Sequence, residues 1–307
     1  MPKLLLFLAT QKGFTALRHL IKTNLRKHIG FVVTFHEDAS NQNWGTLILK
    51  ECTKSDIPCF LWSEVKNFIA DLSVRYDVTG AVAISWRYLL PLELNDILIC
   101  PLIVFHDSLL PRYRGFAPTP TAIMAGEKEI GVTAFFASEE VDAGDIIVQT
   151  KMNISQDACI KDIIDEQSEI YATMLEKIIL DMQAGTINAT PQNENDATYS
   201  IWRNVEDCRI DWTKTSEEIY NFVRALGSPY PNAFTYYDGQ KVDILKVEVI
   251  PDKKFVIRDC GKIWCCKNNH PEVICGSGMV KILLAVNSDG DKVSFKKLRC
   301  VLGSIVR

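Results

Sequence analysis

The chain has 307 residues, of which 47% are hydrophobic and 23% are charged, and its formal net charge is −4. This length is sufficient for one sizeable core and a smaller second unit, and the composition is ordinary for a globular protein. The acidic balance argues against a polyanion-binding surface, because a nucleic-acid partner normally requires Lys and Arg to gather on one face. We therefore expect no nucleic-acid partner.

The sequence also argues against membrane insertion, secretion and metal binding. No stretch approaches the roughly 20 apolar residues that span a bilayer, and the run 4–9 is too short for a signal peptide. The ten cysteines include no Cys-x-x-Cys pair, and even the group from Cys260 to Cys275 lacks the spacing of a zinc site. We expect no membrane partner, no metal, reduced thiols and a cytoplasmic location.

Strand-like and helix-like segments alternate along the first half of the chain. Short continuous apolar runs are typical of strands covered on both faces, and apolar residues at helical spacing indicate the helices between them. The predicted strands are 4–9, 29–35, 58–62, 81–85, 103–106, 132–137 and 146–150. The predicted helices are 14–21, 47–55, 65–72, 92–97 and 159–182. This order predicts right-handed crossovers and a Rossmann-like, mostly parallel α/β sheet.

The pattern changes after the polar stretch 190–198. A helix at 216–226 is followed by a Pro-rich turn and then by short strands, and Asp238-Gly239 is a strong hairpin signal. The predicted strands of this part are 233–237, 242–250, 254–258, 262–266, 280–286 and 292–297. The pattern predicts a smaller β-rich domain of the open-barrel kind. We place the two domains at 1–190 and 198–307.

A polar loop after the predicted strand 103–106 carries the first candidate chemistry. His106 ends this strand, and Ser108-Leu109-Leu110-Pro111-Arg112-Tyr113-Arg114-Gly115 follows it. Ligands of open α/β sheets bind beyond the carboxyl ends of the strands, where the segments 10–14, 85–90 and 106–115 should meet. A histidine there can exchange protons near neutral pH, and two arginines favour an anionic ligand.

An acidic loop, Glu139-Glu140-Val141-Asp142-Ala143-Gly144-Asp145, precedes the predicted strand 146–150. A carboxylate beside a histidine raises the pKa of the imidazole and fixes its tautomer, so this loop offers a partner for His106. Taken separately, both features have ordinary structural explanations. A histidine after a strand is more often a structural hydrogen-bonding group, and an acidic loop with glycine is usually a solvated turn.

The two loops and the segment between them together resemble one known family. The shared motifs are His106-x-Ser108-Leu109-Leu110-Pro111-x-Tyr113-Arg114-Gly115, Gly126-Glu127 with Gly131-Val132-Thr133, and Val141-Asp142-Ala143-Gly144-Asp145. They are similar to those of the 10-formyltetrahydrofolate-dependent formyltransferases, which include methionyl-tRNA, glycinamide ribonucleotide and sugar N-formyltransferases. The resemblance is strong over 80–150 and weaker elsewhere, where it rests on Ile210-Asp211-Trp212 and the block 224–234.

The resemblance implies catalysis by an Asn-x-His pair and a distant aspartate. His106 matches the histidine and Asp142 the aspartate, but the asparagine position is Val104. The family asparagine helps to hold the formyl oxygen, and loss of one such donor typically costs about a hundredfold or more in rate. Either another donor serves (His106, a backbone N–H or water) or the enzyme is slow. We favour the first explanation, because the rest of the site is intact.

The resemblance also implies how the co-substrate, 10-formyltetrahydrofolate, is held. Backbone groups of two loops would pair with the edge of the pterin, although ordinary aromatic packing is an equal explanation for Trp86 and Tyr88. The candidate cofactor-binding residues are Trp86, Arg87, Tyr88, Leu89, Glu139, Val141 and Asp142.

The amine acceptor is expected to be a nucleotide-linked amino sugar, such as dTDP-4-amino-4,6-dideoxyglucose, because the acidic charge disfavours methionyl-tRNA. Tyr199 and Trp202 would stack on a base and Arg203 or Arg224 would meet a pyrophosphate, unless these aromatics serve packing between domains. The candidate substrate-binding residues are Ser108, Arg112, Tyr113, Arg114, Gly115, Tyr199, Trp202, Arg203, Arg224 and Tyr230. The resemblance implies a homodimer. A methionyl-tRNA formyltransferase, a non-catalytic folate- or nucleotide-binding relative and a formyl-folate hydrolase remain alternatives.

Overall fold

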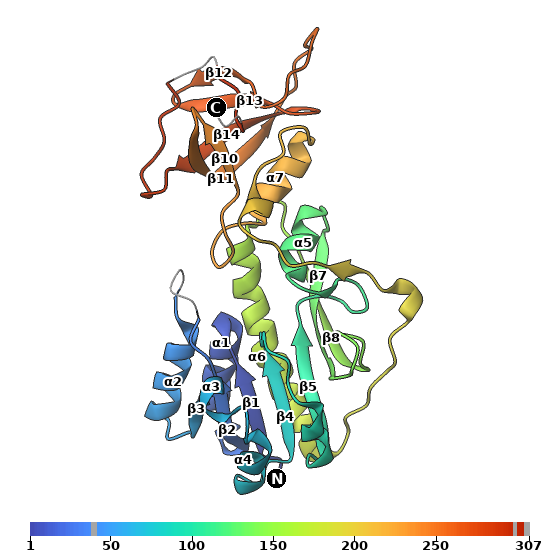
Figure 1. Cartoon of the computed structure of the whole chain (residues 1–307). Coiled ribbons are helices and arrows are strands. Elements are labelled where there is room, and N and C mark those ends of the chain that lie inside the picture. Colours follow the sequence, from blue (N-terminus) through green and yellow to red (C-terminus); the bar gives the residue numbers. More distant parts are fainter. Residues whose placement is uncertain (38–41, 297–299, 304–307) are drawn as a thin grey trace. The chain divides into compact units, whose positions relative to one another are not determined.

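The computed structural model describes residues 1–37, 42–296 and 300–303. The chain forms two compact units, each assembled from more than one segment (Figure 1). The first unit comprises Met1–Pro118, Glu129–Asn153 and Asp162–Ser200. The second comprises Thr119–Lys128, Ile154–Lys161 and Ile201–Arg307. The polar stretch 190–198 therefore packs with the first unit.

A seven-stranded sheet forms the centre of the first unit, in the order β3-β2-β1-β4-β5-β7-β8. The first five strands run parallel, whereas β7 is antiparallel to β5 and to β8. The strands are β1 (Leu4–Leu8), β2 (Ile29–Thr34), β3 (Cys59–Leu61), β4 (Gly80–Ile84), β5 (Cys100–His106), β7 (Glu129–Phe136) and β8 (Ile146–Asn153). The predicted Rossmann-like, mostly parallel sheet is confirmed.

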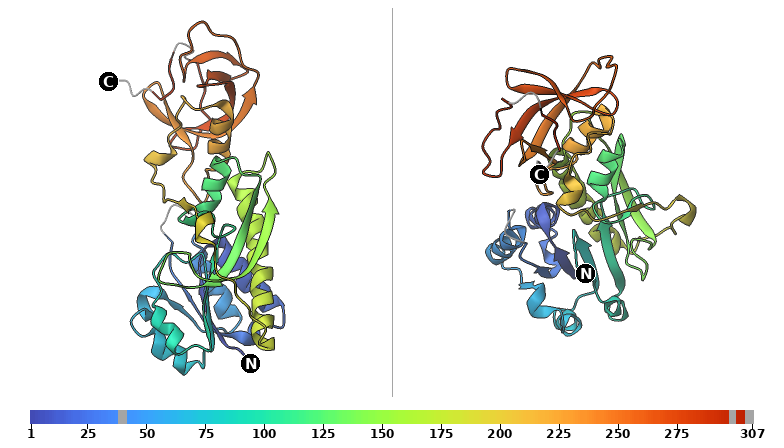
Figure 2. Two further views of the ribbon diagram at one scale, coloured as in Figure 1. Left: turned by 90° about the vertical axis from the view of Figure 1, so that its right-hand side faces the viewer. Right: turned by 45° about the horizontal axis from the view of Figure 1, so that its top comes forward.

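Helices cover both faces of this sheet (Figures 1 and 2). The apolar run of β1 is fully buried because Leu4, Leu6 and Leu8 pack on one face, while Leu5 and Phe7 pack on the other. The first face is covered by α1 (Thr10–Lys22), α2 (Trp44–Lys54) and α6 (Ile160–Ala184), and the second by α3 (Trp62–Val65) and α4 (Ile69–Arg75). Short 3₁₀ turns are η1 (Arg26–His28) and η2 (Leu92–Asp96).

The second unit is built on a five-stranded antiparallel sheet in the order β10-β11-β14-β13-β12, which confirms a β-rich C-terminal part. Its strands are β10 (Phe234–Tyr237), β11 (Gln240–Ile250), β12 (Ile263–Lys267), β13 (His270–Ile274) and β14 (Met279–Val286). Asp238 and Gly239 form the tight turn between β10 and β11, both with positive φ.

Helix α7 (Ser216–Arg224) of the second unit packs on β11 and β14 and begins at a capping box, in which Thr215 and Glu218 exchange hydrogen bonds. The remaining elements of the chain are short. They are α5 (Pro118–Met124), β6 (Arg114–Gly115), β9 (Tyr199–Ser200), η3 (Glu194–Asp196) and η4 (Glu206–Cys208).

Several predicted elements were wrong. The single helix predicted at 65–72 is two helices, because the chain turns between α3 and α4 and Phe68 adopts an extended φ of −139°. The helix at 92–97 is the 3₁₀ turn η2. No strand forms at 254–258, because Arg258 bonds to Asp252 and to the carbonyls of Cys275 and Gly278 and so folds the segment into a loop.

The strand predicted at 292–297 is also wrong in its described part. It is reduced to one isolated bridge between Lys292 and Val286, and Lys297 lies outside the described residues. Helix α5 and strand β13 are among the elements that were missed. Pro118 is a favoured first residue for α5, and Asn268-Asn269, both with positive φ, form the turn that leads into β13.

Candidate active site

The strand order of the first sheet reverses between β1 and β4, and the candidate site lies beyond the carboxyl end of the next strand, β5. Such switch points open a crevice beyond the carboxyl ends of the strands. Thr10 follows β1 and Ser85 follows β4, and both have positive φ, of 57° and 52°. Tyr113 and Asp142 also adopt this region, which is strained for residues other than glycine and is often found at functional sites.

His106 ends β5 and is 8% exposed. Its Nε2 lies 2.7 Å from the carbonyl oxygen of Tyr113, and its Nδ1 lies 3.4 Å from Oδ2 of Asp142. The structure therefore brings together the two residues that the sequence singled out as catalytic. Because side chains alternate along a strand, Val104 projects from the same face of β5 as His106, as in the Asn-x-His arrangement.

The hydrogen-bond partner of the His106 imidazole indicates which ring nitrogen carries a hydrogen. A ring nitrogen that bonds to a carbonyl oxygen must carry a hydrogen, so Nε2 of His106 donates to Tyr113. Nδ1 faces a carboxylate oxygen, which also accepts and does not donate when ionised. An imidazole placed in this way can exchange a proton or stabilise negative charge.

Asp142 is fixed from two sides. Its Oδ2 accepts a hydrogen bond of 2.8 Å from the backbone N–H of Gly115, and its carbonyl oxygen accepts one of 2.8 Å from Nε2 of Gln192. Gly115 has a φ of +97°, and a Cβ there would meet the carbonyl oxygen of Ser200 at 2.5 Å. Only glycine therefore allows this N–H to reach the carboxylate.

Ser108 and Arg114, two of the candidate substrate-binding residues, have buried side chains that form hydrogen bonds within the chain. Ser108 Oγ donates to the carbonyl of Arg112 at 2.6 Å. Arg114 is 1% exposed, and its guanidinium binds Glu194 in a bidentate pair and Gln192 through two further bonds. The structure thus gives the Arg114 side chain a role in holding the loop, away from solvent.

The candidate cofactor-binding loop follows β4. Trp86 lies among aromatic rings, with centroids 5.1 Å from Phe7, 5.2 Å from Phe35 and 5.7 Å from Trp62. Its buried indole N–H has no hydrogen-bond partner among the described residues.

The side chains that follow Trp86 are exposed. Arg87 lies over the ring of Phe35 at 4.5 Å, and Tyr88 stacks on Trp62. Leu89 is 94% exposed and Val141, in the acidic loop, is 63% exposed, while Glu139 is also exposed.

The other candidate substrate residues are divided between the two units. In the first unit, Arg112 and Tyr199 are exposed, and the Arg112 guanidinium lies 5.4 Å from the ring centre of Tyr113. Four belong to the second unit: Trp202 is exposed, Arg203 is half-buried, Tyr230 packs on the core, and Arg224 bonds to Asn221 and to the carbonyl of Ala158.

A buried charged group beside the site was missed at the sequence level. Lys12 of α1 is 5% exposed, and its Nζ lies 2.5 Å from Oδ2 of Asp107, whose other oxygen, Oδ1, accepts a hydrogen bond from the Tyr171 hydroxyl. Burial alone would raise the pKa of Asp107, but Lys12 and Tyr171 outweigh it and hold that pKa below its usual range. The sequence did contain a sign of this burial, because Lys12 falls on the apolar face of α1.

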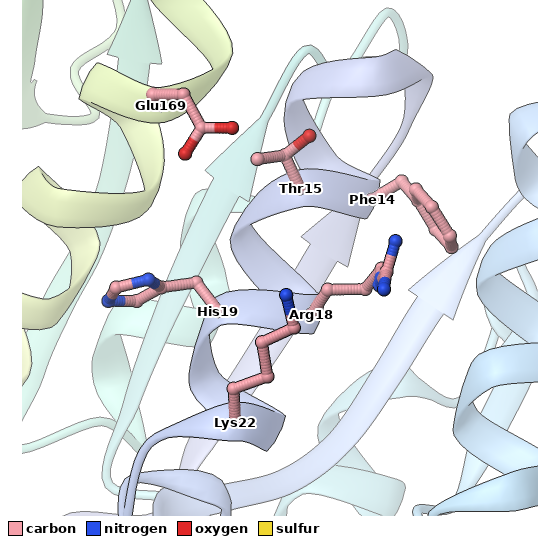
Figure 3. A pocket seen from close by; sticks show the side chains of 6 residues that line it. All are labelled: Phe14, Thr15, Arg18, His19, Lys22 and Glu169. Carbon is pink, nitrogen blue, oxygen red and sulfur yellow. The ribbon is translucent and has the colours of Figure 1, made fainter.

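Two hollows in the first unit lie elsewhere. One of about 160 Å³ is lined by Arg18, His19 and Lys22 of α1 and by Glu169 of α6, with charges of both signs (Figure 3). The other, of about 670 Å³, is lined by residues near the start of β5 and the end of α6. Neither is lined by His106 or Asp142.

The described part of the chain offers no cluster of three or more His, Cys, Asp or Glu side chains arranged to hold a metal ion. Within the same residues, every helix is too short or too polar to cross a membrane.

The mostly parallel α/β sheet carries a histidine–aspartate pair beyond the carboxyl end of β5. The formyl transferase family model matches residues 8–177, and the model for the formyl transferase C-terminal domain matches residues 204–300. The chain belongs to the formyl transferase family, which confirms the resemblance seen in the motifs.

Similar proteins differ in the acceptors that their names imply. A methionyl-tRNA formyltransferase of Fusobacterium nucleatum is 36% identical over 203 residues, which is 66% of this chain and 62% of that protein. The match thus spans less than two thirds of that relative.

Two solved structures have a similar fold at only 18% identity. The N-formyltransferase of Helicobacter canadensis, solved with folinic acid and dTDP-3-aminofucose, gives a TM-score of 0.69 over 92% of this chain and 99% of that chain. A sugar 3N-formyl transferase, solved in the presence of dTDP and 5-N-formyl-THF, gives 0.68 over 97% and 99%.

Proposed function

We propose that this protein transfers a formyl group from 10-formyltetrahydrofolate to the amino group of a nucleotide-linked amino sugar. The observation that carries the proposal is the contact between His106 and Asp142 beyond the carboxyl end of β5, with Asp142 fixed by the Gly115 N–H. A histidine held in this way can supply a proton and stabilise charge on a carbonyl oxygen, which is what transfer of an acyl group to an amine requires.

The loops beside His106 fit a folate. A flat heteroaromatic ring needs apolar contacts and a few hydrogen-bonding groups. Leu89 and Val141 are exposed apolar side chains, one on each of the two loops. Trp86, Arg87, Tyr88 and Leu89 on one loop and Glu139, Val141 and Asp142 on the other would hold the co-substrate, which supplies an activated formyl group.

The side chains of this protein divide the catalytic work. His106 donates a proton or a hydrogen bond to the formyl oxygen, and Asp142 orients the imidazole and stabilises its charged form. Because Nε2 of His106 is held by the Tyr113 carbonyl, donation from this nitrogen to a ligand requires that hydrogen bond to be exchanged. Val104 contributes no donor, so His106 takes the larger share of stabilisation.

A sugar acceptor is favoured by charge and by the solved relatives. The chain carries a net charge of −4, which disfavours a polyanion such as tRNA. Two structures with a similar fold were solved with dTDP or a dTDP-linked amino sugar. Tyr199 and Arg112 are exposed near the loop 108–115 and have the chemistry to meet a base and a phosphate, respectively.

Methionyl-tRNA is the second candidate acceptor, because a methionyl-tRNA formyltransferase is 36% identical over its matched part. An acceptor panel distinguishes the candidates. The purified protein is incubated with 10-formyltetrahydrofolate and with dTDP-linked amino sugars, charged methionyl-tRNA or buffer alone, and folate release is measured together with the formylated product.

The proposal expects N-formyl sugar and little folate release in buffer. If formylated tRNA formed and formylated sugar did not, methionyl-tRNA would be the acceptor and the sugar proposal would be wrong. Equal folate release in every arm would identify a hydrolase, and no turnover at all would indicate a non-catalytic relative.

A further inference from the structure

We propose that Arg114, Gln192 and Glu194, which we call the linker clamp, are positioning residues for the His106–Asp142 pair. This inference rests on the proposed function, because it concerns the geometry of the same pair. Gln192 and Glu194 lie in the polar stretch after α6, far along the sequence from the two loops that they join. No motif of the family resemblance includes them.

Gln192 uses all of its hydrogen-bonding groups. Its amide nitrogen donates to the carbonyl oxygens of Asp142 at 2.8 Å and Gly144 at 2.7 Å. Its amide oxygen accepts two bonds from Arg114, at 3.1 Å from Nε and 2.8 Å from Nη2. Both amide protons and both acceptor sites are thereby occupied, so the orientation of the amide is determined by its partners.

Glu194 compensates the buried charge of Arg114. Nη1 of Arg114 donates to Oε2 at 2.8 Å and Nη2 donates to Oε1 at 2.7 Å, which is the bidentate geometry of a strong pair. This pairing raises the pKa of Arg114 and lowers the pKa of Glu194. An arginine that is 1% exposed requires such a partner, since a buried charge without one is strongly unfavourable.

The clamp holds both ends of the hydrogen bond that fixes the catalytic carboxylate. Gln192 holds the backbone of Asp142, and Arg114 directly precedes Gly115, whose N–H donates to Asp142 Oδ2. Gly115 pairs with Ser200 in the short β6–β9 ladder, whereas Asp142 lies in a loop outside the strands, so no strand ladder joins the two loops. We infer that the side chains of the clamp supply the missing constraint and set the distance between Asp142 and His106.

The sharpest variant is Gln192→Glu, which preserves the size of the side chain and its bonds to Arg114. It replaces the two N–H donors with an oxygen facing two carbonyl oxygens, so the Asp142 loop is released. We expect kcat to fall at least tenfold at saturating substrates, with KM for the folate within about threefold of wild type and a changed pH profile of kcat.

Asn193→Ala is the matched control. In the part of the chain that the structure describes, the hydrogen bonds of this neighbouring side chain run to the N–H of Asn195 and to Asp196, within the stretch. Arg114→Lys keeps the charge but loses the planar fork, and we expect it to resemble Gln192→Glu in its pH profile. A purely structural role would lower thermal stability in these variants without altering the pH profile of the folded fraction.

A measurement that needs no turnover separates failure of this inference from failure of the proposed function. The protein is labelled with ¹⁵N-histidine and its ring signals are recorded by NMR. The signals of His106 are those, among the five histidines, that disappear in His106→Asn. They are then followed as the pH is changed. We expect these signals and their titration to shift in Gln192→Glu and to stay unchanged in Asn193→Ala. Unchanged His106 signals in a folded Gln192→Glu variant would overturn the inference, even if wild type formylated a sugar.

Discussion

Two regions of the first unit differ in how far their side chains are buried and bonded to other residues of the protein. Around His106, Lys12 pairs with Asp107 and Arg114 pairs with Glu194, and both cations are at least 94% buried. In the loop after β4, Leu89 is 94% exposed. The difference indicates that the proposed catalytic pair lies in a region held by internal bonds, while the loop proposed to meet the folate keeps apolar surface exposed. Preorganisation of this kind reduces the rearrangement needed at the moment of reaction.

The largest effect on formyl transfer should come from a change of His106, which lies at the centre of the region with buried ion pairs. We expect His106→Asn to lower formyl transfer by about 10³-fold or more, because the proton donor is lost while the size of the polar group is nearly kept. The fold should survive, as judged by circular dichroism and a thermal midpoint within a few degrees of wild type. Retained transfer by a folded His106→Asn protein would remove the basis of the assignment.

The second test compares a buried ion pair with an exposed one. Lys12→Met leaves Asp107 buried without its cation, and we expect a loss of about 3 kcal/mol in the free energy of unfolding, measured with urea. Lys177→Met is the control, because Lys177 and Asp181 form a largely exposed pair on α6 and should contribute less than about 0.5 kcal/mol. Similar losses in both variants would contradict the distinction drawn between buried and exposed pairs.

Acid should diminish the difference between wild type and Lys12→Met. The pKa of Asp107 is lowered in the folded protein, so its contribution to stability is present above the pKa of an unfolded aspartate. That contribution is lost as the pH falls below about 4, through the lower folded pKa. Urea unfolding at a series of pH values measures the difference in free energy of unfolding between wild type and Lys12→Met. A difference that grew in acid would contradict the predicted direction of the pH dependence.

A smaller effect is expected in the exposed region. Leu89→Ser removes apolar contact with the folate, and we expect KM for 10-formyltetrahydrofolate to rise about tenfold with little change in kcat. Ile99→Ser is the matched control, since Ile99 is 85% exposed but precedes β5, at the opposite end of that strand from His106. Initial-rate kinetics on both variants test this, and an equal effect of the two would show that Leu89 does not meet the folate.

The smallest effect is expected at the position where the family has asparagine. If His106, a backbone N–H or water already supplies the missing donor, Val104→Asn should change turnover by less than about tenfold. Single-turnover rates with saturating folate measure this directly. An increase of a hundredfold would show that nothing compensates for the valine and that the natural enzyme is slow.

Local signals were sufficient for most of the first unit. The buried run at β1 and the helical stripe of α1 follow from side-chain periodicity, and Asp238-Gly239 identified the first hairpin of the second unit. The strand prediction at 254–258 was wrong because the short apolar run Phe255-Val256-Ile257 does not reveal that Arg258 binds Asp252 and nearby carbonyls. Long-range side-chain contacts of this kind determine whether a short apolar stretch becomes a strand, and periodicity carries no information on them.

The site could be predicted only where a motif marked it. His106 and Asp142 were selected from the resemblance, and the structure places them in contact. Arg114 was assigned to a ligand because arginine beside a strand end commonly meets an anion, yet its partners Gln192 and Glu194 lie about eighty residues further along. A polar stretch of Gln, Asn and Glu gives no local sign that two of its side chains are bound to a buried guanidinium.

The linker clamp also determines where the chain can be divided when domains of this family are recombined. A cut at residue 190, where composition places the boundary, would separate Gln192 and Glu194 from Arg114. A junction after Ser200 keeps the clamp and the pairing of β9 with β6 on one polypeptide. Chimeras that exchange the C-terminal part should therefore take residues 191–200 from the parent that supplies the histidine loop.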